Sequence, residues 1–119
     1  MKDNVILDRS KNFALRIVRM YRHLCEKKNE YVLSKQILRS GTSIGANVRE
    51  AQRAQSLKDF VAKMHIALKE ADETAYWLEL LHGSKYLTPK EFESIYAECQ
   101  EILCLLTKII KSGKRVSDE

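Results

Sequence analysis

Apolar residues recur along this 119-residue chain at the spacing of amphipathic helices. In the first such stretch, Phe13, Ile17, Tyr21 and Leu24 follow one another at intervals of three or four positions, with polar residues between them. This interval places side chains on one face of an α-helix. Three later stretches repeat the pattern. We therefore expect helices over about residues 8–28, 30–53, 56–82 and 88–112.

Capping residues stand near the ends of the later stretches. Ser56 with Asp59, and Thr88 with Glu91, have the spacing of a capping box, in which two side chains satisfy free N–H groups of the first helical turn. Gly83 is suited to the left-handed conformation that often follows the last turn of a helix. These signals predict where the third and fourth helices begin and where the third one ends.

The second stretch contains two glycines in a segment that propensity alone would make a loop. Each glycine costs about 1 kcal/mol in a helix relative to alanine. Ile44 and Val48 nevertheless continue in phase with Ile37, which a loop would not preserve. We therefore expect a continuous helix, in which Gly41 and Gly45 lie one turn apart and let a neighbouring backbone approach closely.

The predicted links between helices are too short to run back along a helix, so neighbouring helices must be antiparallel. The sequence thus predicts an all-α, up-down-up-down four-helix bundle in a single domain spanning residues 1–119. Asp8 or Ser10 can cap the first helix, and polar residues follow the fourth. We expect residues 1–7 and 113–119 to fray.

Other features of the chain favour a cytoplasmic protein. No apolar run approaches the roughly 20 residues that span a bilayer, and no secretory leader pattern is evident. The cysteines Cys25, Cys99 and Cys104 are odd in number and lie within apolar helical patterns, so we expect reduced, buried thiols.

The third stretch is apolar on two sides. Beyond its inner stripe, a second apolar group projects from another side, consisting of Ile66, Trp77, Leu80 and Leu81. A monomeric bundle of four helices does not need a helix buried on two sides. The second group therefore predicts a subunit interface.

Residues that could carry out catalysis are sparse. Glu79 and His82 have the spacing used by di-iron bundles, but such sites need two of these pairs and further inward carboxylates. Glu70 and Glu73 are two neighbouring carboxylates, for which exposed charge or ion pairing to the basic helices is the simpler interpretation. We therefore expect no catalytic residue, no metal and no cofactor. An iron- or manganese-carboxylate enzyme is the third hypothesis, after nucleic-acid binding and a scaffold for a protein partner.

Charge is unevenly divided along the chain. The net charge is +5, but residues 1–55 contain 12 Lys or Arg against five Asp or Glu, whereas residues 56–119 contain nine against 11. Eight basic residues lie opposite the apolar stripes of the first two helices: Arg9, Arg16, Arg19, Arg22, Lys35, Arg39, Arg49 and Arg53. Such a surface can bind a phosphate backbone. The alternatives are ordinary solvated helix faces or pairing with acidic groups on a neighbouring helix or subunit.

One segment resembles a known family. Its core is S-x-x-S-I-x-x-N-V-x-E, followed in register by S-x-x-D-F from position 56 and A-L-K-E-A-x-E-T from position 67. The residues that carry the resemblance are Ser40, Ser43, Ile44, Asn47, Glu50, Asp59 and Phe60. Over about residues 8–111, the chain resembles the four-helix-bundle proteins encoded in intervening sequences of bacterial 23S rRNA genes. We expect structural roles for the motif, with the Asn47 amide satisfying a buried polar group and Glu50 pairing with an arginine across the bundle or across a subunit boundary.

The resemblance implies a ring-like homopentamer. A related branch of the family, the accessory proteins of diversity-generating retroelements, implies binding to nucleic acid and to a reverse transcriptase. The function expected from charge and resemblance together is a non-enzymatic homo-oligomer that binds RNA or DNA. The alternative is a scaffold that recruits a protein partner, such as a nucleic-acid enzyme, without contacting nucleic acid itself.

Overall fold

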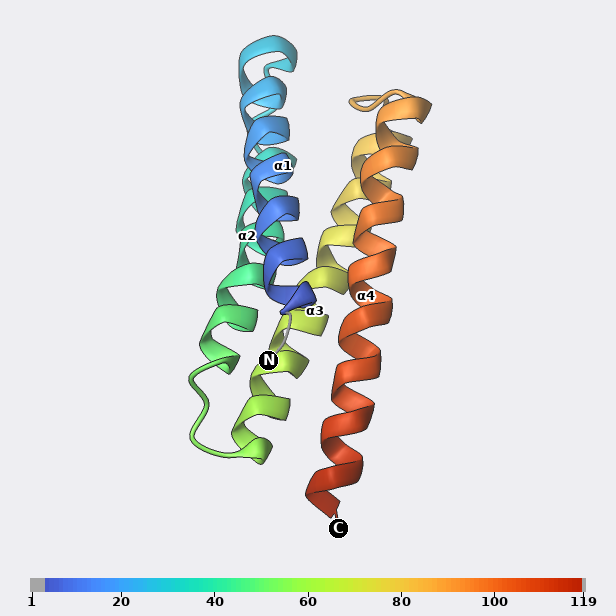
Figure 1. Cartoon of the computed structure of the whole chain (residues 1–119). Coiled ribbons are helices and arrows are strands. Elements are labelled where there is room, and N and C mark those ends of the chain that lie inside the picture. The colour runs from blue at the N-terminus through green and yellow to red at the C-terminus, as the bar shows by residue number, and fades with distance from the viewer. Residues whose placement is uncertain (1–3, 119) are drawn as a thin grey trace.

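The computed structural model describes residues 4–118 of the chain, with side chains described up to residue 113. It contains four α-helices: α1 (Val5–Lys28), α2 (Leu33–Ala51), α3 (Leu57–Gly83) and α4 (Pro89–Asp118), as Figure 1 shows. No strand occurs among the described residues. The four predicted helices and the all-α bundle are confirmed.

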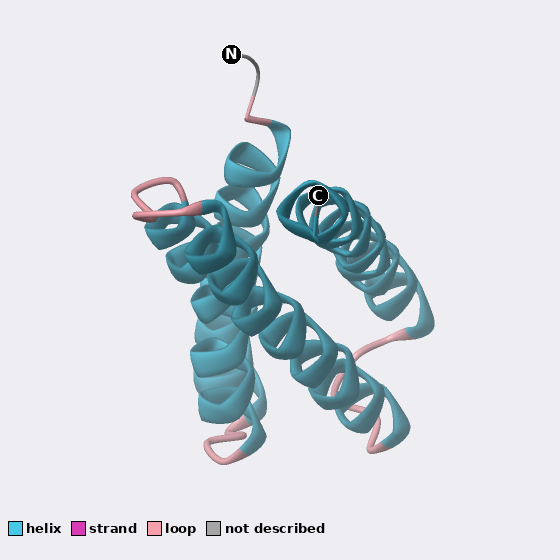
Figure 2. Cartoon of the chain, turned by 90° about the horizontal axis from the view of Figure 1, so that it is seen from below, coloured by secondary structure: helices cyan, strands magenta, loops and turns pink. Residues whose placement is uncertain are grey.

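The helices run up, down, up and down in a bundle 51 Å long and about 22 Å across. Consecutive helices pack along one another, whereas α1 and α4 contact each other much more lightly. In the end-on view of Figure 2, α4, which ends at C, stands apart from the helix that begins near N. The α1–α4 seam is therefore the weakest side contact of the bundle. No helix among the described residues has the length and apolar character needed to cross a membrane.

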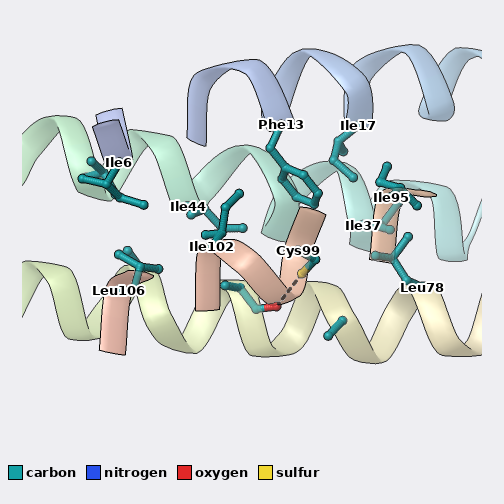
Figure 3. Close-up of a cluster of buried hydrophobic side chains, with 14 of the residues drawn as sticks. Ile6, Phe13, Ile17, Ile37, Ile44, Leu78, Ile95, Cys99, Ile102 and Leu106 are labelled. Atoms are coloured by element: carbon teal, nitrogen blue, oxygen red, sulfur yellow. Dashed lines mark hydrogen bonds between the residues drawn. The ribbon is translucent and has the colours of Figure 1, made fainter. Parts of the chain in front are cut away.

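The core is built from the predicted apolar stripes. Figure 3 shows side chains from all four helices converging on the bundle axis, and Phe13, Ile17, Ile44, Leu78 and Ile102 have no exposed surface. Burying one such side chain contributes roughly 1.5–3 kcal/mol. Leu81 is also fully buried in this core. The prediction that Leu81 lies at a subunit interface is therefore wrong, because the side chain has no surface left for a partner.

The helix through the two glycines is confirmed. A methyl group added at Gly41 would lie 2.8 Å from Cγ1 of Ile17, and one at Gly45 would lie 3.4 Å from the backbone oxygen of Ser10. Both glycines therefore face α1. The predicted close approach of a backbone occurs at Gly45, whereas at Gly41 a buried β-branched side chain fills the space.

Two helices are longer than the sequence predicts. α1 begins at Val5, because Ile6 is buried in the core, and neither Asp8 nor Ser10 caps it. α4 continues through Gly113, which is buried against Val61, to Asp118. Residues 5–7 and 113–118 are thus helical and lie beyond the predicted helix bounds, fraying at both ends stays a prediction, and residues 1–3 and 119 lie outside the described residues.

The capping box of α4 is confirmed, and at α3 the Ser56 cap is confirmed while the Asp59 carboxylate accepts the backbone N–H of Gln55, at 3.2 Å, in place of that of Ser56. The backbone N–H of Asp59 donates to the Ser56 hydroxyl at 3.0 Å, and that of Glu91 donates to the Thr88 hydroxyl at 3.1 Å. The prediction for Gly83 is wrong, because no glycine among the described residues has a positive φ. The residue in the left-handed region beyond α3 is Lys85, with φ of 71°.

The start of α2 differs from the prediction. Glu30 precedes the helix instead of opening it, and its side chain folds back over the first turn. The Glu30 carboxylate accepts the backbone N–H groups of Val32, Leu33 and Ser34 at 3.2, 3.0 and 2.6 Å. The helix ends at Ala51, two residues before the predicted end. The buried carboxylate of Glu30 thus caps the N-terminus of α2.

Candidate nucleic-acid interface

The eight basic residues proposed for phosphate binding all lie on the outside of the bundle, but three of them are paired within the chain. Arg9 donates to Glu101 at 2.9 Å, and Arg16 donates to Glu98 at 2.6 Å. Arg39 contacts Glu70, at 3.2 Å, and Glu73. The neighbouring-helix alternative therefore holds for these three arginines, whose partners belong to α3 and α4 of the same chain.

Two of these ion pairs cross the α1–α4 seam. Arg16 also donates to the Ser94 hydroxyl at 3.1 Å, so that one guanidinium contacts two side chains of α4. Exposed ion pairs contribute about 0–1 kcal/mol each. Arg16 and Glu98 are 34% and 24% exposed, against 49% and 62% for Arg9 and Glu101, so the Arg16 pair is the better shielded from solvent. These contacts hold together the side of the bundle with the least apolar packing.

The other five basic side chains are exposed and make no ion pair among the described residues. They are Arg19, Arg22, Lys35, Arg49 and Arg53. The Sγ of Cys25 lies 3.7 Å from the Ser34 hydroxyl, which places the α1 end carrying Arg22 beside the α2 end carrying Lys35. Arg49 and Arg53 lie at the opposite end of α2, about 20 Å away at 1.5 Å per residue. The free cations thus form two groups near the two ends of the α1–α2 pair.

The family-motif residues make contacts within the chain. Ser40 is buried and accepts a hydrogen bond from the Thr74 hydroxyl at 2.8 Å, which joins α2 to α3. Asn47 donates to the backbone oxygen of Ser43 at 2.8 Å, so its amide bonds to its own helix and not to a buried polar group elsewhere. Within the described residues, the cation near Glu50 is Lys63, at 3.9 Å, so an arginine partner for Glu50 remains a prediction only across a subunit boundary.

Three of the four proposed interface residues have exposed surface. Ile66 is 46% exposed, and Trp77 and Leu80 are half-buried on the same outer side of α3. The Trp77 indole N–H donates to Glu73 at 2.9 Å, which links this group to the ion pairs of Arg39. Sequence reasoning missed Tyr76, which is 53% exposed with its ring centroid 5.2 Å from that of Trp77. Its position next to Trp77 and one helical turn before Leu80 could have identified it as a member of the same apolar group.

The residues considered for catalysis have structural partners. Glu79 accepts a hydrogen bond from the Tyr96 hydroxyl at 2.7 Å, and the His82 ring stacks on Phe92. Glu70 and Glu73 pair with Arg39, as the simpler interpretation predicted. Within the described part of the chain, no three His, Cys, Asp or Glu side chains gather as a metal site would require.

The three cysteines differ in their surroundings. Cys99 is fully buried, donates to the backbone oxygen of Ala71 at 3.4 Å (Figure 3), and has its thiol pKa raised to about 12 by burial, with smaller contributions from Asp72 and Glu98. Cys25 is half-buried and Cys104 is exposed, so the prediction that all three are buried is wrong. Only the thiolate reacts with alkylating reagents.

We expect iodoacetamide at pH 8 to modify Cys104 rapidly and Cys99 not at all in the folded protein. Mass spectrometry of tryptic peptides at successive times measures both rates, and the same reaction in 6 M guanidinium chloride serves as the control in which all thiols react. Alkylation of Cys99 at a rate within tenfold of Cys104 under native conditions would contradict the burial of its thiol.

These features define a small antiparallel four-helix-bundle protein that carries a group of exposed arginines, unpaired among the described residues, on the side of α1 and α2. The chain belongs to the 23S rRNA-intervening sequence protein family, whose model matches residues 2–108. It is similar to a crystal structure of a protein of unknown function from the S23 ribosomal protein family of Bacteroides thetaiotaomicron VPI-5482. The two share 57% sequence identity over 89% of this chain and 98% of that one, with a TM-score of 0.88. No curated protein matches the sequence.

Proposed function

We propose that this protein is a non-enzymatic, homo-oligomeric bundle that binds RNA or DNA through unpaired cations on α1, on α2 and in the turn that follows α2. The observation that carries the proposal is the division of the basic residues into two sets. Arg9, Arg16 and Arg39 are neutralised by carboxylates of the same chain, whereas the other five remain exposed and free of ion pairs among the described residues. The proposal therefore assigns binding to Arg19, Arg22, Lys35, Arg49 and Arg53.

The chemistry of these five residues suits a phosphate backbone. Four of them are arginines, whose planar guanidinium can donate two parallel hydrogen bonds to a phosphate. A helix face with no base-reading motif gives binding that depends on charge and shape more than on sequence. Five phosphate contacts predict that the logarithm of the binding constant falls with the logarithm of salt concentration with a slope of roughly −4.5 for duplex DNA.

The test replaces Arg19, Arg22, Arg49 and Arg53 together with glutamate. Fluorescence anisotropy with a labelled mixed-sequence RNA and DNA duplex, measured from 50 to 300 mM salt, should show at least about 100-fold weaker binding and a slope nearer zero. All four side chains are exposed, so circular dichroism should show an unchanged fold.

The matched control makes the same change in net charge on the other half of the bundle. It replaces the exposed residues Lys58, Lys69, Lys90 and Lys108 with glutamate. The proposal predicts that this variant keeps most of the affinity. Equal loss in both variants, or no binding of the unmodified protein at 50 mM salt, would show that the α1–α2 surface is not a binding site.

The exposed side chains on α3 favour a second element of the proposal, assembly of the bundle with copies of itself. Tyr76, Trp77 and Leu80 form one group on the outer side of α3, and Ile66 is exposed on the same helix about 15 Å before Tyr76. We expect I66D/L80D to reduce the mass measured by light scattering to that of a single chain. If the unmodified protein is already a single chain, the homo-oligomer is excluded. A protein partner captured after nuclease treatment by the arginine variant would instead favour the scaffold alternative.

A further inference from the structure

A cleft at one end of the bundle is not part of the proposed α1–α2 surface. It lies where the turn between α3 and α4 meets the last residue of α1, at the end that also carries the α1–α2 turn (Figure 1). Its volume is about 410 Å³, which falls within the roughly 300–1,000 Å³ of small-molecule sites. It is lined by Lys28, His82, Gly83, Lys85, Tyr86, Leu87, Thr88 and Pro89.

The lining combines positive charge with aromatic rings. Lys28 and Lys85 approach the cleft from opposite elements, and no ion pair is formed by either among the described residues. The pKa of Glu91 is lowered chiefly by the hydrogen bond from the Thr88 backbone N–H and slightly by the charges of His23 and Lys28. Because the Glu91 carboxylate is held in the capping box and forms no ion pair with either lysine among the described residues, both ammonium groups remain available to a ligand.

One aromatic wall is held in place by a column of stacked rings. The His82 ring stacks on Phe92 with centroids 4.2 Å apart and planes within 10°, and Phe92 stacks on Tyr96 at 4.7 Å. The Tyr96 hydroxyl donates to Glu79 at 2.7 Å, which fixes the far end of the column. His82 therefore presents a fixed ring to the cleft, with Tyr86 as a second ring in its lining.

Lys85 has an unfavourable backbone conformation for its residue type. Its φ of 71° lies in the left-handed region, where glycine is favoured because a residue with a Cβ is sterically strained. The turn itself needs this conformation, since the N–H of Tyr86 donates to the backbone oxygen of Leu81 at 2.8 Å to close the end of α3. A glycine would satisfy the turn better, so the lysine contributes charge to the cleft and not stability to the turn.

We propose that this cleft binds a nucleoside monophosphate group, with the base stacked on the rings of His82 and Tyr86 and the phosphate between Lys28 and Lys85. Base–aromatic stacking tolerates any base, because every base has a π-face. The ligand is either a free nucleotide or the 5′-phosphorylated end of a single strand, since both present the same chemistry. The site goes beyond the α1–α2 surface and stands or fails independently of it.

The test titrates ¹⁵N-labelled protein with adenosine 5′-monophosphate at low salt and follows the amide resonances of Gly83, Lys85 and Tyr86. Lys85→Gly removes the cation and relieves the backbone, so the variant should be at least as stable as the parent and bind about fivefold more weakly. Adding Lys28→Gln should reduce binding about 25-fold in all. Lys90→Gln, which alters an exposed cation outside the lining, should change binding less than twofold.

The ligand series separates the contributions. Adenosine and inorganic phosphate should each bind at least tenfold more weakly than the nucleotide. A 5′-phosphorylated tetranucleotide that binds more tightly than its 5′-hydroxyl counterpart identifies a strand end as the ligand, and equal binding of these two identifies the free nucleotide.

No resonance shift with 10 mM nucleotide, or equal binding of the nucleotide and inorganic phosphate, would overturn the proposal. The fourfold arginine variant of α1 and α2 should retain binding in the cleft, so failure of one site is distinguishable from failure of the other.

Discussion

Replacing Gly41 with alanine should lower the free energy of unfolding by about 2 kcal/mol. The added Cβ would lie 2.8 and 2.9 Å from the two γ-carbons of Ile17, which is fully buried. Ile17 is β-branched and has little rotamer freedom in a helix, so α1 itself must shift. Overpacking of a core costs typically 1–3 kcal/mol, and we expect the upper end here. The gain of about 1 kcal/mol in helix propensity offsets only part of that cost.

Gly83 provides a matched control for the same chemical change. It is the last residue of α3, has no positive φ, and an added Cβ would meet no atom within 4 Å. Gly83→Ala should therefore raise the free energy of unfolding by about 0.5–1 kcal/mol. Urea unfolding followed by circular dichroism measures both variants. Effects of the same sign would contradict the packing of α1 against α2 through Gly41.

The sequence was sufficient to predict the helices because each apolar stripe is a local pattern. The phase of Ile37, Ile44 and Val48 placed α2 correctly across two glycines. Features that depend on tertiary contacts were not predictable in this way. Burial of Ile6 extends α1 beyond its apparent cap, and contact with Val61 lets α4 pass through Gly113.

The candidate site, too, was predictable only where it depends on local sequence patterns and not on tertiary contacts. Periodicity placed the eight basic residues on the outside of the bundle, as the structure has them. It could not identify which of them are paired, because Arg9 and Glu101 are separated by 92 positions and meet only when α4 returns beside α1. Likewise, the second apolar side of α3 was visible in sequence, but whether Leu81 belonged to it or to the core depends on a few tens of degrees of helix rotation.

Glu30→Ala should lower the free energy of unfolding by about 2–3 kcal/mol. The carboxylate is in a residue that is only 7% exposed, and it accepts three backbone N–H groups at the start of α2. Hydrogen bonds to a charged group contribute about 1.5–3 kcal/mol, and loss of an N-cap costs about 0.5–2 kcal/mol. The buried donors cannot all regain water, because Ser34 is itself buried. Glu30→Gln keeps an acceptor oxygen of the same shape without the charge and should cost about half as much.

Glu50→Ala, which removes a carboxylate from within α2, is the control. Glu50 is exposed and its only ion pair among the described residues, to Lys63, is 3.9 Å long, so its removal should change the free energy of unfolding by less than about 0.5 kcal/mol. Because α2 packs on both α1 and α3, fraying at its first turn should also expose Leu33 and Ser34 before global unfolding. Amide hydrogen exchange in Glu30→Ala should therefore accelerate more at Leu33 and Ser34 than in α4, where it should rise only by the factor that the loss of global stability requires. Equal acceleration throughout the bundle would contradict local fraying at the start of α2.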